Sequence, residues 1–328
     1  MTLAVSGVAP YATEQYKGAS KFIPDVWSGK MQVKFYAATC LSEITNNDYE
    51  GEIKDTGDTV IIRSIANITI RPYVKGAVLT SEVPTSTPIS LNIDTGKYFQ
   101  VVLDDVDKVQ TDIRLMNSFT DDAGEQMKIA VEKNVFGNDS NVGVRLSAHT
   151  ANQGNAAGAI SGNIRLGLAT GVLPCYVSKN GAAAGDGTSG NPKGIVDHIT
   201  DMGQVLDEQN VPEQGRWLLI SSAIANRIKK SDLKQAQMTG DGESITRNGK
   251  LGVIDRFTLY VTNNLYKSAG EQTIFAGTRD AVSFASQLTK VETLRSTATF
   301  GDIVRGMNVF GFTVTKPEAF VASVVTIV

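Results

Sequence analysis

A glycine pattern is the feature of this sequence that most resembles a cofactor-binding signature. Gly185, Gly187 and Gly190 spell GxGxxG between a strand-like segment at 175–177 and a predicted helix. In a dinucleotide-binding fold the first glycine forms the tight turn directly after the strand, and the last lies at the start of the helix. Here several residues intervene on both sides, and no Gly-Lys pair is followed by Ser or Thr. The pattern therefore predicts a flexible surface loop that tolerates substitution, with a nucleotide-binding enzyme as the weaker alternative.

An acidic run formed by Asp104, Asp105 and Asp107 could supply oxygen ligands to a hard cation such as calcium or magnesium. The run lacks the glycine turn and the distal glutamate of a calcium-binding loop. We expect it instead to be the solvated end of a strand, where it places negative charge near the N-terminus of the following helix. No metal site is predicted.

Catalytic patterns are incomplete. Ser231 and Lys234 match SxxK, but neither SDN nor KTG occurs in the chain. Asp197 and His198 are adjacent in a predicted helix and point to different faces, which argues against a Ser-His-Asp arrangement. The sequence therefore predicts no catalytic residue and no cofactor, and we expect a protein that is not an enzyme.

Histidine and cysteine are too scarce to build a site of their own. The two histidines, His149 and His198, are expected to be ordinary surface residues or satisfied core residues. The two cysteines, Cys40 and Cys175, lie far apart, so neither a disulfide framework nor a cysteine-rich metal site is expected within one chain. Two isolated thiols fit a reducing cytoplasm.

Composition excludes two classes of protein. The chain has 328 residues, enough for one large domain or two ordinary ones. Its 31 basic and 34 acidic residues give a formal charge of -3, without the basic excess that dominates affinity for nucleic acid. No apolar run approaches the roughly 18 residues of a membrane span, and no signal peptide is recognisable. We expect a soluble protein that could enclose DNA without binding it tightly.

The elements that would position these residues begin with a small, polar segment at 1–23 and a short helix from Pro24 that ends before Asn46. Residues 57–103 are predicted to be extended. Apolar and polar residues alternate there, with the apolar positions at Ile68, Ile70, Ile89, Leu91 and Ile93. Two such strands are at best marginally stable alone, so the arm should dock on another surface, such as a second subunit.

The rest of the chain alternates helices and strands, which indicates an α+β protein. A long helix is expected after Thr111, which is a plausible N-cap, with a narrow apolar stripe. Residues 137–193 are expected to form loops and short strands. The remaining predictions are a helix from Gly194 that ends before Pro212, a strand at 217–220, a helix capped by Ser221 or Ser222, a strand at 257–261, a helix capped by Thr278 with Ala281, Phe284, Ala285 and Leu288 on one face, and a strand-like tail at 307–328 interrupted at Pro317.

The order of these elements, together with many short segments, resembles the major capsid (coat) proteins of tailed bacteriophages across roughly 90–320. The segments are LNID at 91–94, DDVDKVQ at 104–110, LDEQNVP at 206–212, GRWLLI at 215–220, VTNNL at 261–265, FASQL at 284–288, FGD at 300–302, RG at 305–306, VFG at 309–311 and KPE at 316–318. Each is weak alone, and their shared order carries the resemblance. The same shell fold occurs in encapsulin nanocompartments.

The resemblance implies an α+β capsid fold with a fixed division of the chain. It implies an N-terminal arm at 1–50, an extended β-hairpin loop at 51–103, a peripheral domain at 104–193, an axial domain at 194–290, and C-terminal strands at 291–328 that complete the peripheral domain. The peripheral domain would hold a spine helix at about 112–136 and a possible small insertion at 140–193.

The implied function is a structural subunit that assembles into hexamers and pentamers of an icosahedral head around double-stranded DNA. The implied partners are other copies of the chain, a separate scaffolding protein, a portal protein, possible cement proteins and the packaged DNA, in a virion assembled in the host cytoplasm. An encapsulin-like shell is the nearest alternative. The residues expected at contacts between subunits are Arg71, Lys75, Glu82, Asp104, Asp105, Asp107, Asp241, Glu243 and Arg247.

Overall fold

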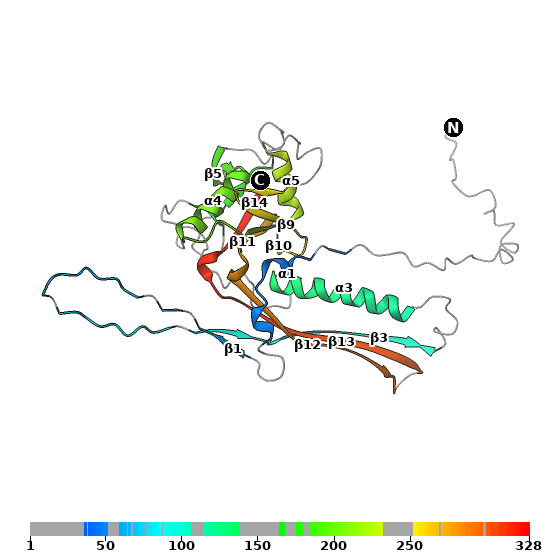
Figure 1. The fold of residues 1–328 in the computed structure, drawn as a ribbon. Helices are drawn as coiled ribbons and strands as arrows, with labels where there is room; N and C mark the ends of the chain where they lie inside the picture. The colour runs from blue at the N-terminus through cyan, green and yellow to red at the C-terminus, as the bar shows by residue number, and fades with distance from the viewer. Residues whose placement is uncertain are drawn as a thin grey trace, which may run out of the picture.

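The computed structural model describes residues 36–37, 39–51, 59–63, 65–66, 68–76, 78–86, 88–105, 115–137, 164–167, 175–179, 184–231, 252–268, 270–297 and 300–328. The predicted helix from Pro24 and the proposed cap Thr111 therefore lie outside the described residues. The described elements are mixed helices and strands, so the α+β prediction is confirmed (Figure 1).

A nine-stranded mixed sheet forms the larger part of the core, in the order β5-β6-β4-β14-β11-β7-β9-β8, with β10 paired to β11. Its strands are β4 (Cys175–Val177), β5 (Ala184–Thr188), β6 (Asn191–Lys193), β7 (Arg216–Ile220), β8 (Val253–Ile254), β9 (Phe257–Val261), β10 (Lys267–Ser268), β11 (Glu271–Thr278) and β14 (Phe320–Ile327). Every residue of β7 is buried, as expected for a strand near the middle of a covered sheet.

Two amphipathic helices belong to this sheet, α4 (Ile195–Glu208) and α5 (Ser222–Lys230). In α4 the buried residues recur at helical spacing, and the helix ends before Pro212, as predicted. In α5 the Ser221 hydroxyl accepts a hydrogen bond from the amide of Ile224 at 3.4 Å, which confirms one of the two predicted caps.

A second, three-stranded antiparallel sheet has the order β12-β13-β3 and packs against the long helix α3 (Leu115–Val135). Its strands are β3 (Thr95–Asp104), β12 (Val282–Arg295) and β13 (Gly301–Val314). The prediction of a helix after Thr278 is wrong, because a short 3-10 turn, η6 (Arg279–Ala281), leads directly into β12. The spacing of a short apolar run is compatible with both a helix and a strand. Here cross-strand pairs such as Phe284 with Phe312 stabilise the strand.

Two short connections join the sheets. The chain passes from β11 through η6 into β12, and returns from β13 through the 3-10 turn η7 (Pro317–Ala319) into β14. The expected domain boundary at 290 therefore falls inside β12. The last strand, which was expected in the peripheral domain, lies in the nine-stranded sheet.

The two-stranded arm is confirmed at its base, where β1 (Thr59–Ile62) pairs antiparallel with β2 (Ile89–Asn92). The described residues beyond this ladder run out to a turn at Lys75 and Gly76. The arm projects from the body on the side opposite to α3 and the long strands (Figure 1). A short helix α1 (Leu41–Ile44) and a 3-10 turn η3 (Asp48–Gly51) precede it. No helix in the described part of the chain is both long and apolar enough to cross a membrane.

Candidate functional site

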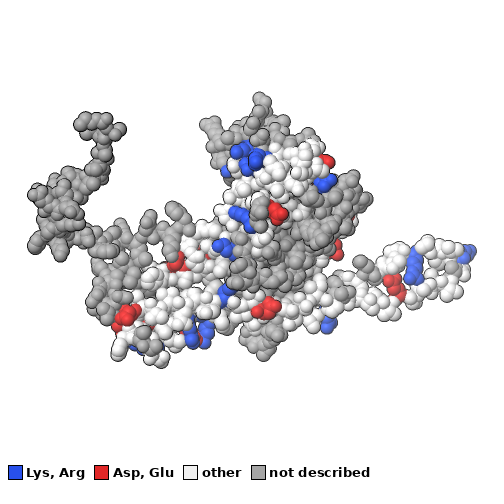
Figure 2. Space-filling model, turned by 180° about the vertical axis from the view of Figure 1, so that it is seen from behind, with Lys and Arg blue, Asp and Glu red and all other residues white. Residues whose placement is uncertain are grey.

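The outer half of the arm exposes aliphatic and aromatic side chains, which makes it the strongest candidate for a functional surface. Ile70 is 90% exposed and Val78 is 95% exposed, so nothing in the described part of the chain covers them. Figure 2 shows that most of this surface carries neither acidic nor basic side chains. Many exposed apolar side chains in one segment are typical of a site of association with another molecule. The exposed residues of the outer half are Ile65, Ile68, Ile70, Tyr73, Val74, Val78, Leu79 and Val83, and Ile61 is exposed at the base of the arm.

The base of the arm behaves differently. Leu91 and Ile93 are buried with Ile62 and Ala285 in a small core of their own. A side chain at Gly311 would lie 1.9 Å from the carbonyl oxygen of Asn92, so this glycine permits the close approach of β13 to the end of β2. The expectation that something outside must cover the whole alternating face is therefore wrong for its second half, which packs within the chain.

Two of the predicted contact residues meet on the arm. Arg71 and Glu82 form an exposed ion pair at 3.9 Å, and the Glu82 carboxylate also accepts from the amide and hydroxyl of Thr69 at 3.4 and 3.3 Å. Lys75 lies in the turn at the tip and is exposed. These charged groups therefore lie among the exposed apolar residues of the arm.

The acidic run pairs with an arginine of the same chain. Nη1 of Arg295 donates to Oδ1 of Asp105 at 2.9 Å and to Oδ1 of Asp302 at 3.2 Å. The hydrogen bonds that Arg295 donates to Asp105 and, second, to Asp302 raise the pKa of Arg295. Asp104 is the exposed last residue of β3. The described residues hold no group of three or more His, Cys, Asp or Glu side chains that could bind a metal ion. The other predicted contact residues, Asp107, Asp241, Glu243 and Arg247, lie outside the described residues.

The glycine pattern forms a β-hairpin, so the prediction of a flexible loop is wrong. Gly185 and Gly187 lie within β5, and Gly190 lies in the turn before β6. A side chain at Gly185 would lie 2.2 Å from the carbonyl oxygen of Pro192, and Gly187 has a positive φ of 84°. The glycines permit close pairing of two strands and do not form the strand-to-helix turn that a dinucleotide requires. The nucleotide-binding alternative is not supported.

A buried Cys-His pair lies under this hairpin. Nδ1 of His198 is 3.4 Å from Sγ of Cys175, and Nε2 is 2.9 Å from Oγ of Ser323. The Ser323 hydroxyl donates to the carbonyl of Leu166 at 2.7 Å, so Nε2 must carry the imidazole proton and Nδ1 accepts from the thiol. Burial raises the pKa of Cys175 to about 12 and lowers that of His198 to about 3. The pair is neutral and enclosed, and this confirms His198 as a satisfied core histidine, while His149 lies outside the described residues.

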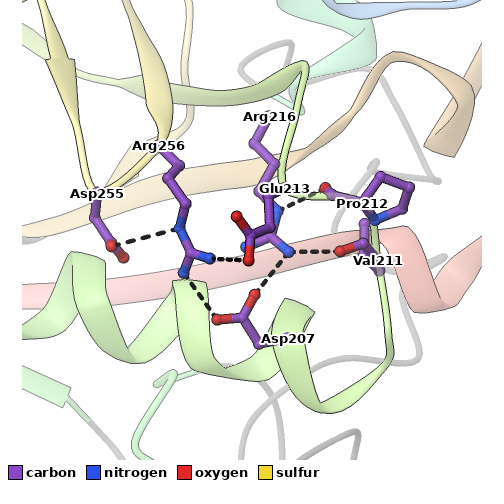
Figure 3. Close-up of polar contacts among 7 residues, drawn as sticks. All are labelled: Asp207, Val211, Pro212, Glu213, Arg216, Asp255 and Arg256. Carbon is purple, nitrogen blue, oxygen red and sulfur yellow. Dashed lines mark hydrogen bonds and ion pairs between the residues drawn. The ribbon is translucent and has the colours of Figure 1, made fainter.

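An ion-pair cluster that sequence reasoning missed holds the loop after α4 (Figure 3). The fully buried Arg216 guanidinium donates to the carbonyls of Val211 and Pro212 at 2.6 and 2.9 Å, and pairs with Asp207 at 2.7 Å. Arg256 bonds the other oxygen of Asp207 at 2.8 Å and pairs with Glu213 at 3.0 Å. Burial raises the pKa of Asp207, but the hydrogen bonds from Arg256 and Arg216 outweigh it and lower that pKa. The cluster fixes a loop and contains no reactive arrangement.

Arg256 lies in a tight turn with an unfavourable backbone conformation. Asp255 and Arg256 form the two-residue connection between β8 and β9, with positive φ angles of 46° and 67°. Such turns favour Asn-Gly or Asp-Gly, and the left-handed conformation costs other residues on the order of 1 kcal/mol each. A side chain at Gly203 of α4 would lie 2.4 Å from Oδ2 of Asp255, so this glycine lets the turn reach the helix.

Comparison with known proteins identifies the fold. No family model matches the chain, and no curated protein matches its sequence. A solved structure from Mycobacterium phage Che8 is 22% identical, with a TM-score of 0.71 over 93% of this chain and 97% of the other. The capsid of Cyanophage P-SCSP1u is 12% identical, with a TM-score of 0.67 over 94% of each chain. The capsid of a native GTA particle is 12% identical, with a TM-score of 0.65 over 97% of this chain and 99% of the other.

These likenesses span nearly the whole chain, from 93% to 97% of its residues. The chain therefore has the capsid fold of tailed bacteriophages, as the sequence resemblance implied. The structures named above come from phage and GTA particles, which does not favour the nanocompartment alternative.

Proposed function

We propose that this protein is a major capsid protein, a structural and non-enzymatic subunit of an icosahedral phage head that encloses double-stranded DNA. The observation that carries the proposal is the arm, which extends a largely uncharged surface (Figure 2) beyond a body with the capsid fold. A two-stranded arm with exposed apolar side chains is stabilised when another molecule covers it. In a shell of identical subunits that molecule is the neighbouring copy.

On this proposal the two sheets belong to different domains of the capsid protein. The three-stranded sheet with α3 forms the peripheral domain, and the nine-stranded sheet with α4 and α5 forms the axial domain. The axial domain would meet its copies around five-fold and six-fold axes, in pentamers and hexamers. On this assignment β14 returns to the axial domain, and the peripheral domain ends with β13.

Contacts that run from an arm on one copy to a different surface on the next are heterologous, and they close into rings when the rotation between copies allows it. Each contact can remain modest, on the order of the 1,000 Å² of a specific interface, because a closed lattice repeats it around every subunit. The formal charge of -3 supports a shell that encloses DNA without sequence-specific binding. A scaffolding protein, a portal protein and cement proteins are further proposed partners, with assembly in the host cytoplasm and a final location in the virion.

Negative-stain electron microscopy of the purified full-length protein tests this function. We expect closed particles or rings of five and six subunits, alone or with a co-expressed scaffolding protein. Particles that contain DNA would support a phage head, and particles that contain an enzyme cargo would support a nanocompartment. A protein that stays monomeric with its proposed partners, at all salt and protein concentrations tested, would contradict the proposal.

A further inference from the structure

A buried carboxylate connects three parts of the chain that are distant in sequence. Glu132, in the last turns of α3, is 1% exposed. Its Oε1 accepts from the amide of Cys40 at 3.0 Å and from the thiol of Cys40 at 3.1 Å, and its Oε2 accepts from Nδ2 of Asn264 at 2.8 Å. Cys40 directly precedes α1, and Asn264 lies in the loop between β9 and β10. Both oxygens are thus held, each by a different part of the molecule.

Each partner is itself fixed in place. The backbone amide of Asn264 donates to the Thr262 hydroxyl at 3.2 Å, and the Thr262 amide donates to the carbonyl of Ile220 at the end of β7. Burial, followed by the nearby Glu132 carboxylate, raises the pKa of the Cys40 thiol, so the thiol keeps its proton and remains a donor. The Glu132 contact therefore attaches α3 to the loop that follows β9 in the nine-stranded sheet.

The C-terminal end of α3 packs on the nine-stranded sheet, where the ring centroids of Phe136 and Phe275 are 6.0 Å apart. The middle of the helix is packed less closely. An open cavity of about 500 Å³ lies between α3 and the three-stranded sheet, with Met127, Val131, Phe99 and Phe284 among its lining residues. The short covalent connections between the sheets are the turns η6 and η7. The segment that begins at Cys40 contacts the first of these turns, because Nε of Arg279 in η6 donates to the carbonyl of Thr45 at 3.0 Å.

We propose that Glu132 is a latch that sets the angle between the three-stranded sheet with α3 and the nine-stranded sheet. From the spine helix, this carboxylate bonds both to the residue that leads into α1 and to a loop of the nine-stranded sheet. Without this contact the apolar packing at the end of α3 must hold the angle by itself, and α3 can shift toward the cavity with η6 and η7 as the hinge. In the proposed capsid this angle would decide how a subunit adapts to pentamers and hexamers, and that consequence rests on the proposed function.

The chemistry of the latch allows an isosteric test. In Glu132→Gln one oxygen can still accept from Cys40, and the Asn264 side chain can turn over so that its Oδ1, which accepts no hydrogen bond within the described part of the chain, accepts from the new amide. This single variant should therefore keep the contact. In Asn264→Asp two carboxylates face each other. In the double variant the amide introduced at position 132 donates to the carboxylate introduced at position 264, so both sides are satisfied again with the same number of heavy atoms. Rescue by the double variant would therefore reflect the contact and not the volume of either side chain.

The angle can be measured in the full-length, unassembled chain with spin labels at Gln126→Cys on α3 and Asn226→Cys on α5, both of which are exposed. The two native thiols are buried and protonated, so labelling is selective. We expect a narrow distance distribution in the reference chain and in Glu132→Gln, and a broad one in Asn264→Asp with a fall in Tm of roughly 5 °C. The double variant should again give a narrow distribution. Equal widths in all four proteins would overturn the latch, as would a double variant that stays broad. Shell formation by the unlabelled chain is scored separately, so a failure of the capsid proposal leaves the distance result readable.

Discussion

Oδ1 of Asp207 lies 2.7 Å from Nη2 of Arg216, so a partly exposed carboxylate neutralises a guanidinium that has no solvent exposure. Arg216 begins β7 near the middle of the nine-stranded sheet, where water cannot replace its partner. Removing one partner of a fully buried pair costs about 3–5 kcal/mol, because the other charge is left uncompensated. Asp207 is 41% exposed, so part of that cost is screened.

We therefore predict that Asp207→Asn lowers the free energy of unfolding by about 2 kcal/mol. Glu213→Gln is the matched control. Glu213 pairs with Nη1 of Arg256, and its side chain is 71% exposed. The control should change stability by no more than about 0.5 kcal/mol. Chemical denaturation of the unassembled chain measures both. Equal losses of stability from the two substitutions would show that the burial of Arg216 does not raise the cost of removing its partner.

The hairpin glycines provide a second prediction. Gly185→Ala should destabilise the protein by about 1–3 kcal/mol, because the new methyl group meets the backbone of β6. Gly190→Ala is the control, since no atom lies within 4 Å of a side chain there, and it should be neutral or slightly stabilising. Thermal unfolding followed by circular dichroism distinguishes them. A harmless Gly185→Ala would restore the original prediction of a tolerant loop.

The buried His198 predicts a pH dependence of stability. Its pKa is lowered to about 3 in the folded chain, so the imidazole stays neutral there, while the unfolded chain binds a proton below about pH 6.5. The contribution of His198 is thus complete above pH 6.5 and is lost as the pH falls toward 3. Between pH 7 and pH 5 the loss is about 2 kcal/mol.

Urea denaturation of the reference chain and of His198→Gln at the two pH values measures this loss. The variant should be less stable at pH 7, because it disturbs the contacts with Cys175 and Ser323. Its stability should fall less than that of the reference chain on acidification. Parallel pH profiles in the two proteins would contradict a neutral, buried His198.

Long, strongly periodic segments were predictable from the sequence because their burial pattern is local. The apolar spacing of α4, the Ser221 cap of α5 and the alternation in β9 required no knowledge of the rest of the chain. The strand β12 was missed because its apolar spacing fits a helix equally well, and only pairing with β13 settles the choice.

The polar clusters were not predictable because they depend on contacts distant in sequence. Asp207 and Arg256 are 49 residues apart, and Glu132 and Asn264 are 132 apart. No local spacing signals that these groups meet. The hairpin glycines were misinterpreted for a related reason. The sequence shows the glycine motif, but it does not show the close approach of two strands that requires glycine there.

The exposed arm provides the last prediction, which tests its role as a joint between subunits. Arg71→Glu combined with Lys75→Glu reverses the charge near the tip and places a second carboxylate beside Glu82. Both positions are exposed, and an exposed ion pair contributes little to stability. The double variant should therefore unfold within about 1 kcal/mol of the reference chain.

Assembly of the same variant should fail or become strongly dependent on salt, because the reversed charges now meet a partner surface that accommodates cations. Arg71→Lys with Lys75→Arg keeps both charges and serves as the control that assembles. Circular-dichroism melting and sedimentation of the assembly products are measured on the same samples. Normal shells from a normally folded charge-reversed variant would exclude the tip from the interface. An unfolded variant would show that the tip supports the subunit's own core, which the exposure of Ile70 and Val78 argues against.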